Sequence, residues 1–129
     1  MTPALIAIAR AVVALPGWEW WPGTRYLVPP AWADGWMPSG RVGDSHSPSL
    51  PPDARDPVPD LTDPATGGAL LDLLGPGWMV DAQVEGSPYA IYRRVTDRSW
   101  LGEHWSGATL AAACCRAAIA LGRWPGRML

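Results

Sequence analysis

The sequence predicts an α+β fold whose core is a small antiparallel sheet in the order helix, three strands, helix. An N-terminal helix and a short Trp-rich hairpin are expected to precede this core. Apolar residues recur every three to four positions in the expected helices and alternate with polar residues in the expected strands. Gly, Pro and Asp separate the segments. The chain of 129 residues has room for one modest core.

The N-terminal helix is indicated by Thr2, which can cap it, and by Pro3, which suits the first helical position. Pro16 and Gly17 end it. One face of this helix must be buried, either against the core or against a partner, because it is apolar. That face consists of Leu5, Ile8, Val12 and Leu15.

Residues 17–28 are strongly aromatic, and their alternation around Pro22-Gly23 predicts a hairpin. Alternate residues of a strand point to opposite sides, so at least one of its three Trp residues should be partly exposed. The aromatic residues either cover the apolar side of the first helix or contact a partner together with Arg25.

Residues 29–59 are rich in Pro, Gly, Ser and Asp. Within them, Arg41-Val42-Gly43 is a candidate second strand of the hairpin. The sequence predicts an N-terminal unit over residues 1–43, a flexible Pro-rich linker over 44–60, the core over 61–122 and a tail over 123–129, all within one folded domain.

The core is predicted from a helix at residues 65–74, strands at 78–85, 89–95 and 100–105, and a helix at 108–121. Asp63 and Pro64 open the first of these helices, and Gly75-Pro76-Gly77 ends it. Gly67 and Gly68 within it indicate either close packing against a neighbour, which we favour, or a late, frayed start of the helix. Both helices are expected on one face of the sheet. The predicted core residues are Leu70, Leu73, Leu74, Val80, Val84, Ile91, Leu110 and Leu121.

Composition argues against several functional classes. The net charge of −2 gives no general attraction to nucleic acid. Cys114 and Cys115 are adjacent on a helix, which disfavours a disulfide between them and suits a reducing cytoplasm. The apolar start of the chain has no basic leading region and is too short to span a bilayer, so we expect a cytoplasmic protein without a membrane segment.

No catalytic residues, metal or cofactor are expected. His46, His104 and the two cysteines lack the spacing of a metal site. Glu103 and His104 point to opposite faces of a strand, and no glycine-framed nucleophile accompanies them. The order of elements is also that of a double-stranded RNA-binding domain, but the start of the last helix carries no basic residue.

Several motifs follow one another in a recognisable order: Gly17-Trp18-x-Trp20, Pro22-Gly23-x-Arg25-Tyr26, Gly40-Arg41-Val42, and Pro59-Asp60-Leu61-Thr62-Asp63-Pro64-Ala65-Thr66 before a Leu-rich helix. With its Ala-rich last helix, the chain resembles the small proteins grouped as the phage alpha-beta-alpha sandwich domain. The resemblance implies a bacteriophage or prophage source and a fold, and it implies no catalytic residues. The chain differs from this pattern in its longer Pro-rich linker and in its tail, residues 122–129.

These observations favour a non-catalytic phage or prophage accessory protein that binds a host or phage protein, for example an inhibitor of a host defence or regulatory complex. One alternative is a single-stranded nucleic-acid-binding protein that uses Trp20, Trp21, Arg25, Arg93 and Arg94. Another is a small enzyme with a polar pocket around Asp81, Arg93 and His104. The predicted partner-binding residues are Trp18, Trp20, Trp21, Arg25, Tyr26, Met79 and Gln83.

Overall fold

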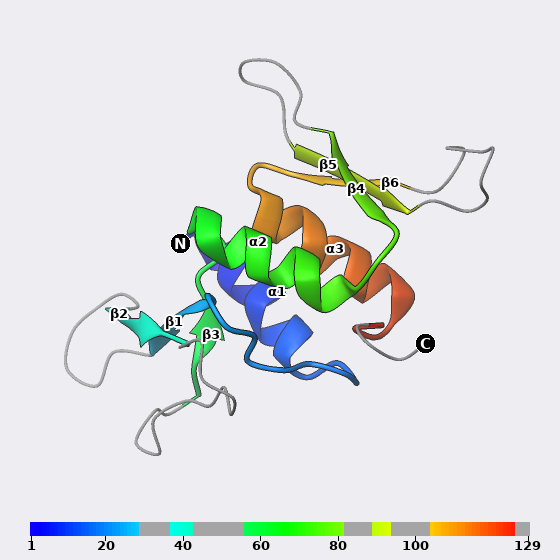
Figure 1. Ribbon diagram of the computed structural model, residues 1–129. Coiled ribbons are helices and arrows are strands. Elements are labelled where there is room, and N and C mark those ends of the chain that lie inside the picture. The colour runs from blue at the N-terminus through cyan, green and yellow to red at the C-terminus, as the bar shows by residue number, and fades with distance from the viewer. Residues whose placement is uncertain (29–36, 43–55, 82–88, 94–103, 126–129) are drawn as a thin grey trace.

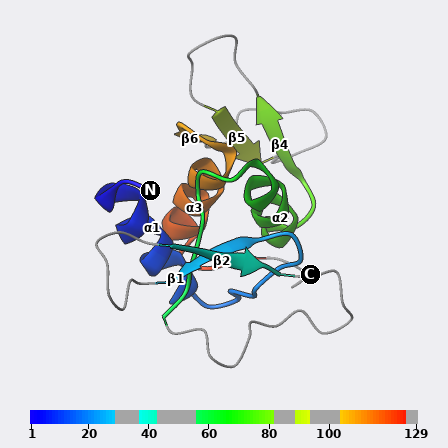
Figure 2. The ribbon, with the colours of Figure 1, turned by 90° about the vertical axis from the view of Figure 1, so that its left-hand side faces the viewer.

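The computed structural model describes residues 1–28, 37–42, 56–81, 89–93 and 104–125. It confirms the α+β class. A layer of helices lies between two antiparallel three-stranded sheets (Figures 1 and 2). The helices are α1 (Pro3–Val13), α2 (Pro64–Leu74) and α3 (Leu110–Leu121). The strands are β1 (Arg25–Val28), β2 (Met37–Arg41), β3 (Val58–Pro59), β4 (Trp78–Asp81), β5 (Tyr89–Arg93) and β6 (His104–Gly107).

Helix α3 is the centre of the molecule. It contacts α1, α2, β5 and β6. Its side chains are small, so each neighbour can approach its backbone closely. The buried residues of α3 are Ala111, Ala112, Ala113, Cys114, Cys115, Ala117 and Ala118.

Helix α2 begins and ends as its sequence predicts. Asp63 caps it by accepting hydrogen bonds from the Thr66 amide at 3.0 Å and from the Thr66 hydroxyl at 2.9 Å, and Gly75 ends it with a φ of 96°. Close packing is confirmed at Gly67, where an added Cβ would lie 3.0 Å from the Cβ of Leu110. The same expectation is wrong for Gly68, because nothing lies within 4 Å of a Cβ there.

Sheet β4-β5-β6 has one face on the helices. The register pairs Val80 with Ile91 and Ile91 with Trp105, so these side chains share the inner face. Helices α2 and α3 both lie on that side of the sheet, as predicted (Figures 1 and 2). Among the predicted core residues, Leu70, Leu73, Leu74 and Ile91 are buried, Val80, Leu110 and Leu121 are partly buried against the core, and Val84 is outside the described residues.

The end of the third strand differs from the prediction. Ser106 and Gly107 were expected to follow the strand, but they belong to β6, and Gly107 pairs with Tyr89. A Cβ at Gly107 would lie 2.7 Å from the amide nitrogen of Ala113. Glycine is therefore required at this point because β6 runs directly against the backbone of α3.

Sheet β2-β1-β3 corrects the predicted Trp-rich hairpin. Residues 18–21 form no strand, and Pro22-Gly23 is not the turn of a hairpin. Strand β1 pairs instead with β2, where Arg25 lies opposite Arg41, so the expected return of the chain at Arg41 is confirmed. Pro22-Gly23 predicted a tight turn between two adjacent strands, but the strand that pairs with β1 lies farther along the chain.

The predicted linker over residues 44–60 extends too far. Val58 and Pro59 form β3 against β1, and both are buried. The Asp60 amide donates a hydrogen bond to the Arg25 carbonyl at 2.8 Å. A proline is tolerated in β3 because it is an edge strand. Residues 44–55 of the predicted linker are outside the described residues.

Adjacent glycines of α2 provide a matched test of the contact between α2 and α3. We expect Gly67→Ala to lower the free energy of unfolding by about 1 kcal/mol or more, because its Cβ would also lie 3.2 Å from the Ala111 amide nitrogen. Gly68→Ala should raise it by up to about 1 kcal/mol, because alanine is the better helix former. Urea unfolding of both variants checks this. Equal effects would contradict the close approach of the two helices.

Candidate functional site

A row of aromatic rings joins the loop after α1 to the chain that follows α3. Trp18 lies 5.4 Å from Trp124 and 5.1 Å from Trp20, measured between ring centroids. Trp20 in turn lies 6.3 Å from Tyr26. The tilted and edge-on ring geometries are those that aromatic pairs favour. The row therefore has a clear packing role.

Trp124 fastens the end of α3 to α1. It is only 1% exposed, its indole nitrogen donates to the Val12 carbonyl at 3.0 Å, and its amide donates to the Pro16 carbonyl at 2.8 Å. The sequence predicts only a tail at this position and gives Trp124 no packing role. The available signal was a large apolar residue just after Gly122, which ends α3 in the left-handed conformation.

Several residues predicted to bind a partner are instead packed inside. Trp18 and Trp21 are partly buried against the core, and Tyr26 is only 5% exposed. This corrects the prediction that Tyr26 contacts a partner, because its ring has almost no free surface. Trp20 is half-buried and lies outside the core cluster. Of this aromatic group, Trp20 is the residue placed most favourably for contact.

Arg25 and Arg41 belong to a polar network that connects sheet β2-β1-β3 to α2. The Arg41 guanidinium donates to both carboxylate oxygens of Asp63, at 2.7 and 3.2 Å. The Arg25 amide donates to the Thr66 hydroxyl at 2.8 Å, and the Arg25 Nε lies 3.9 Å from an oxygen of Asp60. Arg25 was predicted to bind a partner, and its described contacts lie within this network.

The Arg41 guanidinium, together with the bonds from Thr66, holds the pKa of Asp63 below its usual range. The same carboxylate raises the pKa of Arg41. Both side chains are thus ionised at neutral pH, and Asp63 is simultaneously a helix cap and an ion-pair partner.

The outer face of sheet β4-β5-β6 is the second predicted contact area. Met79 on β4 is 41% exposed and lies opposite Tyr92 in the register. Ala90 and Ser106 pair beside them on the same face. No described element covers this face (Figures 1 and 2). Gln83, predicted to join Met79, is outside the described residues, as are the side chains of Asp81, Arg93 and His104.

The two predicted contact areas are far apart. The loop between α1 and β1 lies at one end of the molecule, whereas β4 lies at the other, with the helices between them (Figures 1 and 2). Trp20 and Met79 therefore do not form one continuous surface.

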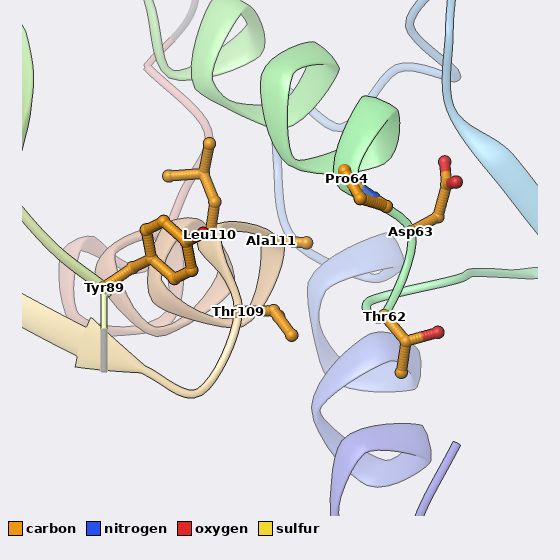
Figure 3. A pocket seen from close by; sticks show the side chains of 7 residues that line it. All are labelled: Thr62, Asp63, Pro64, Tyr89, Thr109, Leu110 and Ala111. Atoms are coloured by element: carbon orange, nitrogen blue, oxygen red, sulfur yellow. The ribbon is translucent and has the colours of Figure 1, made fainter. Parts of the chain in front are cut away.

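A hollow of about 210 Å³ lies where the first turns of α2 and α3 meet β5 (Figure 3). Its walls are mainly apolar, and the side chains of Thr62, Asp63 and Thr109 are already hydrogen-bonded. The Thr109 hydroxyl donates to the Leu61 carbonyl at 2.6 Å, and the Asp63 carboxylate points away from Tyr89 toward its own partners (Figure 3). The lining residues are Thr62, Asp63, Pro64, Tyr89, Thr109, Leu110 and Ala111.

The described residues that could act as nucleophiles or metal ligands are either buried or too far apart to form a site. Burial raises the pKa of Cys114 to about 12, and it also raises the pKa of Cys115, which disfavours the reactive thiolate form. Across the described ranges, no three His, Cys, Asp or Glu residues gather as metal ligands. Over the same ranges, no helix combines the length and apolar character needed to cross a membrane.

Comparisons with protein-family models, curated proteins and solved structures found no match to this chain. Its function is therefore argued from its own residues.

The aromatic row can be divided by mutation into structural and surface members. We expect Trp18→Ala to lower the free energy of unfolding by about 3 kcal/mol, because the ring packs on Trp124 and on the core. Trp20→Ala should cost about 1 kcal/mol, since Trp20 contacts other rings but is not part of the core. Thermal unfolding followed by circular dichroism checks both. A larger loss for Trp20→Ala would contradict this assignment.

The ion pair of Asp63 predicts a pH dependence of stability. A carboxyl group whose pKa is lowered by folding stabilises fully above its unfolded value of about 3.9, and this contribution disappears as the pH falls through the folded pKa. Asp63→Asn keeps a good helix cap and removes the charge.

The variant should therefore lose less stability than the wild type between about pH 5 and pH 2, by about 0.2–1 kcal/mol, the range of exposed ion pairs. Urea unfolding at several pH values measures this difference. Parallel pH profiles for the two proteins would show that the pair does not contribute.

Proposed function

We propose that this chain is a non-catalytic phage or prophage accessory protein that acts by binding a protein partner. The proposal rests on the resemblance of the sequence motifs to those of the phage alpha-beta-alpha sandwich domain and on the outer face of sheet β4-β5-β6, which no described element covers. Phage origin, a bacterial cytoplasmic location and inhibition of a host defence or regulatory complex are parts of this proposal. They rest on the sequence motifs alone. In the described part of the chain, helices lie between two sheets (Figure 1). This is not a helix-sheet-helix sandwich, so the fold adds no support for them.

The observation that carries the proposal is the exposure of Met79. A large flexible apolar side chain that is 41% exposed leaves much of its apolar surface in contact with water. Its cross-strand neighbour Tyr92 supplies an aromatic ring on the same face. Methionine and tyrosine are both enriched at protein interfaces, where they bury a large area.

The remaining predicted contact residues are assigned differently. Trp18, Trp21 and Tyr26 stabilise the fold, and Arg25 contributes to the polar network. The loop between α1 and β1, which contains Trp20, lies at the opposite end of the molecule from β4, which contains Met79 (Figures 1 and 2), so Trp20 is not needed for the same interface. The proposed contact surface therefore consists of Met79, Tyr92 and their neighbours Ala90 and Ser106.

We expect Met79→Arg to abolish or strongly weaken capture of the partner. A buried charge in a well-packed interface centre costs 2 kcal/mol or more, which is roughly a thirtyfold loss of affinity. The assay is affinity capture from a lysate of host bacteria by the immobilised full chain, with mass spectrometry of the bound proteins. Ala4→Arg, at an exposed position of α1, adds the same charge elsewhere and is the matched control.

Loss of the same captured protein with both variants would contradict the assignment of the sheet face, as would its retention by a folded Met79→Arg variant. If a single-stranded oligonucleotide bound the wild type and competed with all captured proteins, the nucleic-acid alternative would replace this proposal.

A further inference from the structure

Strand β4 is an edge strand of its sheet, and no described element pairs with its second side (Figure 2). In an antiparallel sheet, alternate N–H and C=O groups of an edge strand point away from the sheet, where another strand can pair with them. The edge consists of Trp78–Asp81. None of these residues is a proline, so each carries a backbone donor as well as an acceptor.

The other edge strands are protected in ways that β4 is not. Strand β3 has only two residues, one of which is Pro59, and β2 contains Pro38. Short strands and prolines are common means of preventing further pairing at a sheet edge. On β6, the Ser106 carbonyl already accepts a hydrogen bond from Arg116 Nη1 at 3.1 Å. Of the described edges, β4 is therefore the one best suited to accept a further strand.

The side chains of β4 offer apolar contacts on both faces of the sheet. Met79 points to the outer face and is 41% exposed. Val80 points to the inner face, where it is only partly buried against the core. A strand added beside β4 would place its side chains alternately next to these two residues. The edge therefore favours a strand with apolar residues on both faces.

We propose that β4 binds a short extended segment of a protein partner, which joins sheet β4-β5-β6 as a fourth strand. Main-chain hydrogen bonds to the β4 edge hold the segment, and its apolar side chains cover Met79 and Val80. This inference rests on the proposed function and deepens it, because Met79 belongs both to the outer face and to the edge. It specifies the conformation in which the partner is bound.

The length of β4 favours a short segment over a second copy of this chain. Its four residues span about 13 Å. Stable protein–protein interfaces bury about 1,200–2,000 Å², far more than the side-by-side pairing of two such short strands provides. Peptides, in contrast, bind to sheet edges through main-chain hydrogen bonds and a few alternate side chains.

The probe is the fluorescein-labelled peptide Lys-Lys-Thr-Val-Leu-Val-Thr-Lys-Lys. Its Leu and its Val residues point to opposite faces of a strand, and the terminal Lys residues keep it soluble. A twin peptide carries N-methyl groups on the amides of Val, Leu and Val, which removes these backbone donors and keeps every side chain. Binding to the full chain is measured by fluorescence anisotropy at physiological salt, where attraction between distant exposed charges is largely screened.

We expect the peptide to bind at least about tenfold more tightly than its N-methyl twin, because the twin cannot form the main-chain hydrogen bonds. Hydrogen exchange followed by NMR then locates the added strand. At a free peptide concentration about ten times the dissociation constant, alternate amides of β4 should exchange about tenfold more slowly. The amides of β6, the other edge of the same sheet, should be unchanged and are the matched control.

Equal binding of the two peptides, or no binding of either, would overturn the proposed strand addition. Slower exchange in β6 with no change in β4 would also overturn it. Slower exchange in β4 when the protein concentration alone is raised would show that a second copy occupies the edge instead.

Failure of this inference can be distinguished from failure of the proposed function. Loss of capture by Met79→Arg together with equal binding of the two peptides would keep the outer-face contact and reject the added strand. Retained capture by a folded Met79→Arg variant together with selective binding of the unmethylated peptide would reject the outer-face contact and support the strand site.

Discussion

The close packing of α3 against four neighbours is the constraint on which the rest of this structure depends. Alanine and cysteine side chains keep the helix thin, so α1, α2 and sheet β4-β5-β6 can all approach its backbone. Gly67 and Gly107 complete this arrangement, because a side chain would crowd α3 at Gly67 and would collide with its backbone at Gly107. A larger residue at these contacts would separate the layers and leave cavities that cost free energy.

Trp residues then fix the periphery of this helical layer. Trp124 joins the end of α3 to α1 through its ring, its indole nitrogen and its backbone amide. Trp18 packs on it from the loop after α1. With no Phe in the chain, Trp supplies the large apolar side chains, and this explains why a Trp-rich segment is mostly structural here. The surface that we propose for partner binding is the outer face of β4-β5-β6, which carries the exposed Met79.

Local signals predicted those parts of the fold that local chemistry determines. Thr2 and Asp63 cap their helices by accepting amide hydrogen bonds, as expected from sequence, and the alternation around Val80 gave the correct inner face of β4. The errors concern long-range partners. The pairing of β1 with β2 and β3, the burial of Trp124 and the inclusion of Gly107 in β6 all depend on segments distant in sequence. For the candidate site, the exposure of Met79 followed from strand alternation, whereas Tyr26 is buried because β1 is the central strand of its sheet.

Native-state hydrogen exchange tests most directly whether α3 unites the chain into one cooperative unit. We predict that the backbone amides of residues 114–118 are among the slowest to exchange. Those in the second half of α1 should exchange with a similar free energy of opening, because Trp124 joins the two helices. Exchange of the α1 amides at a free energy several kcal/mol below that of α3 would contradict this central role of α3. It would show that the N-terminal region opens independently of the helical centre.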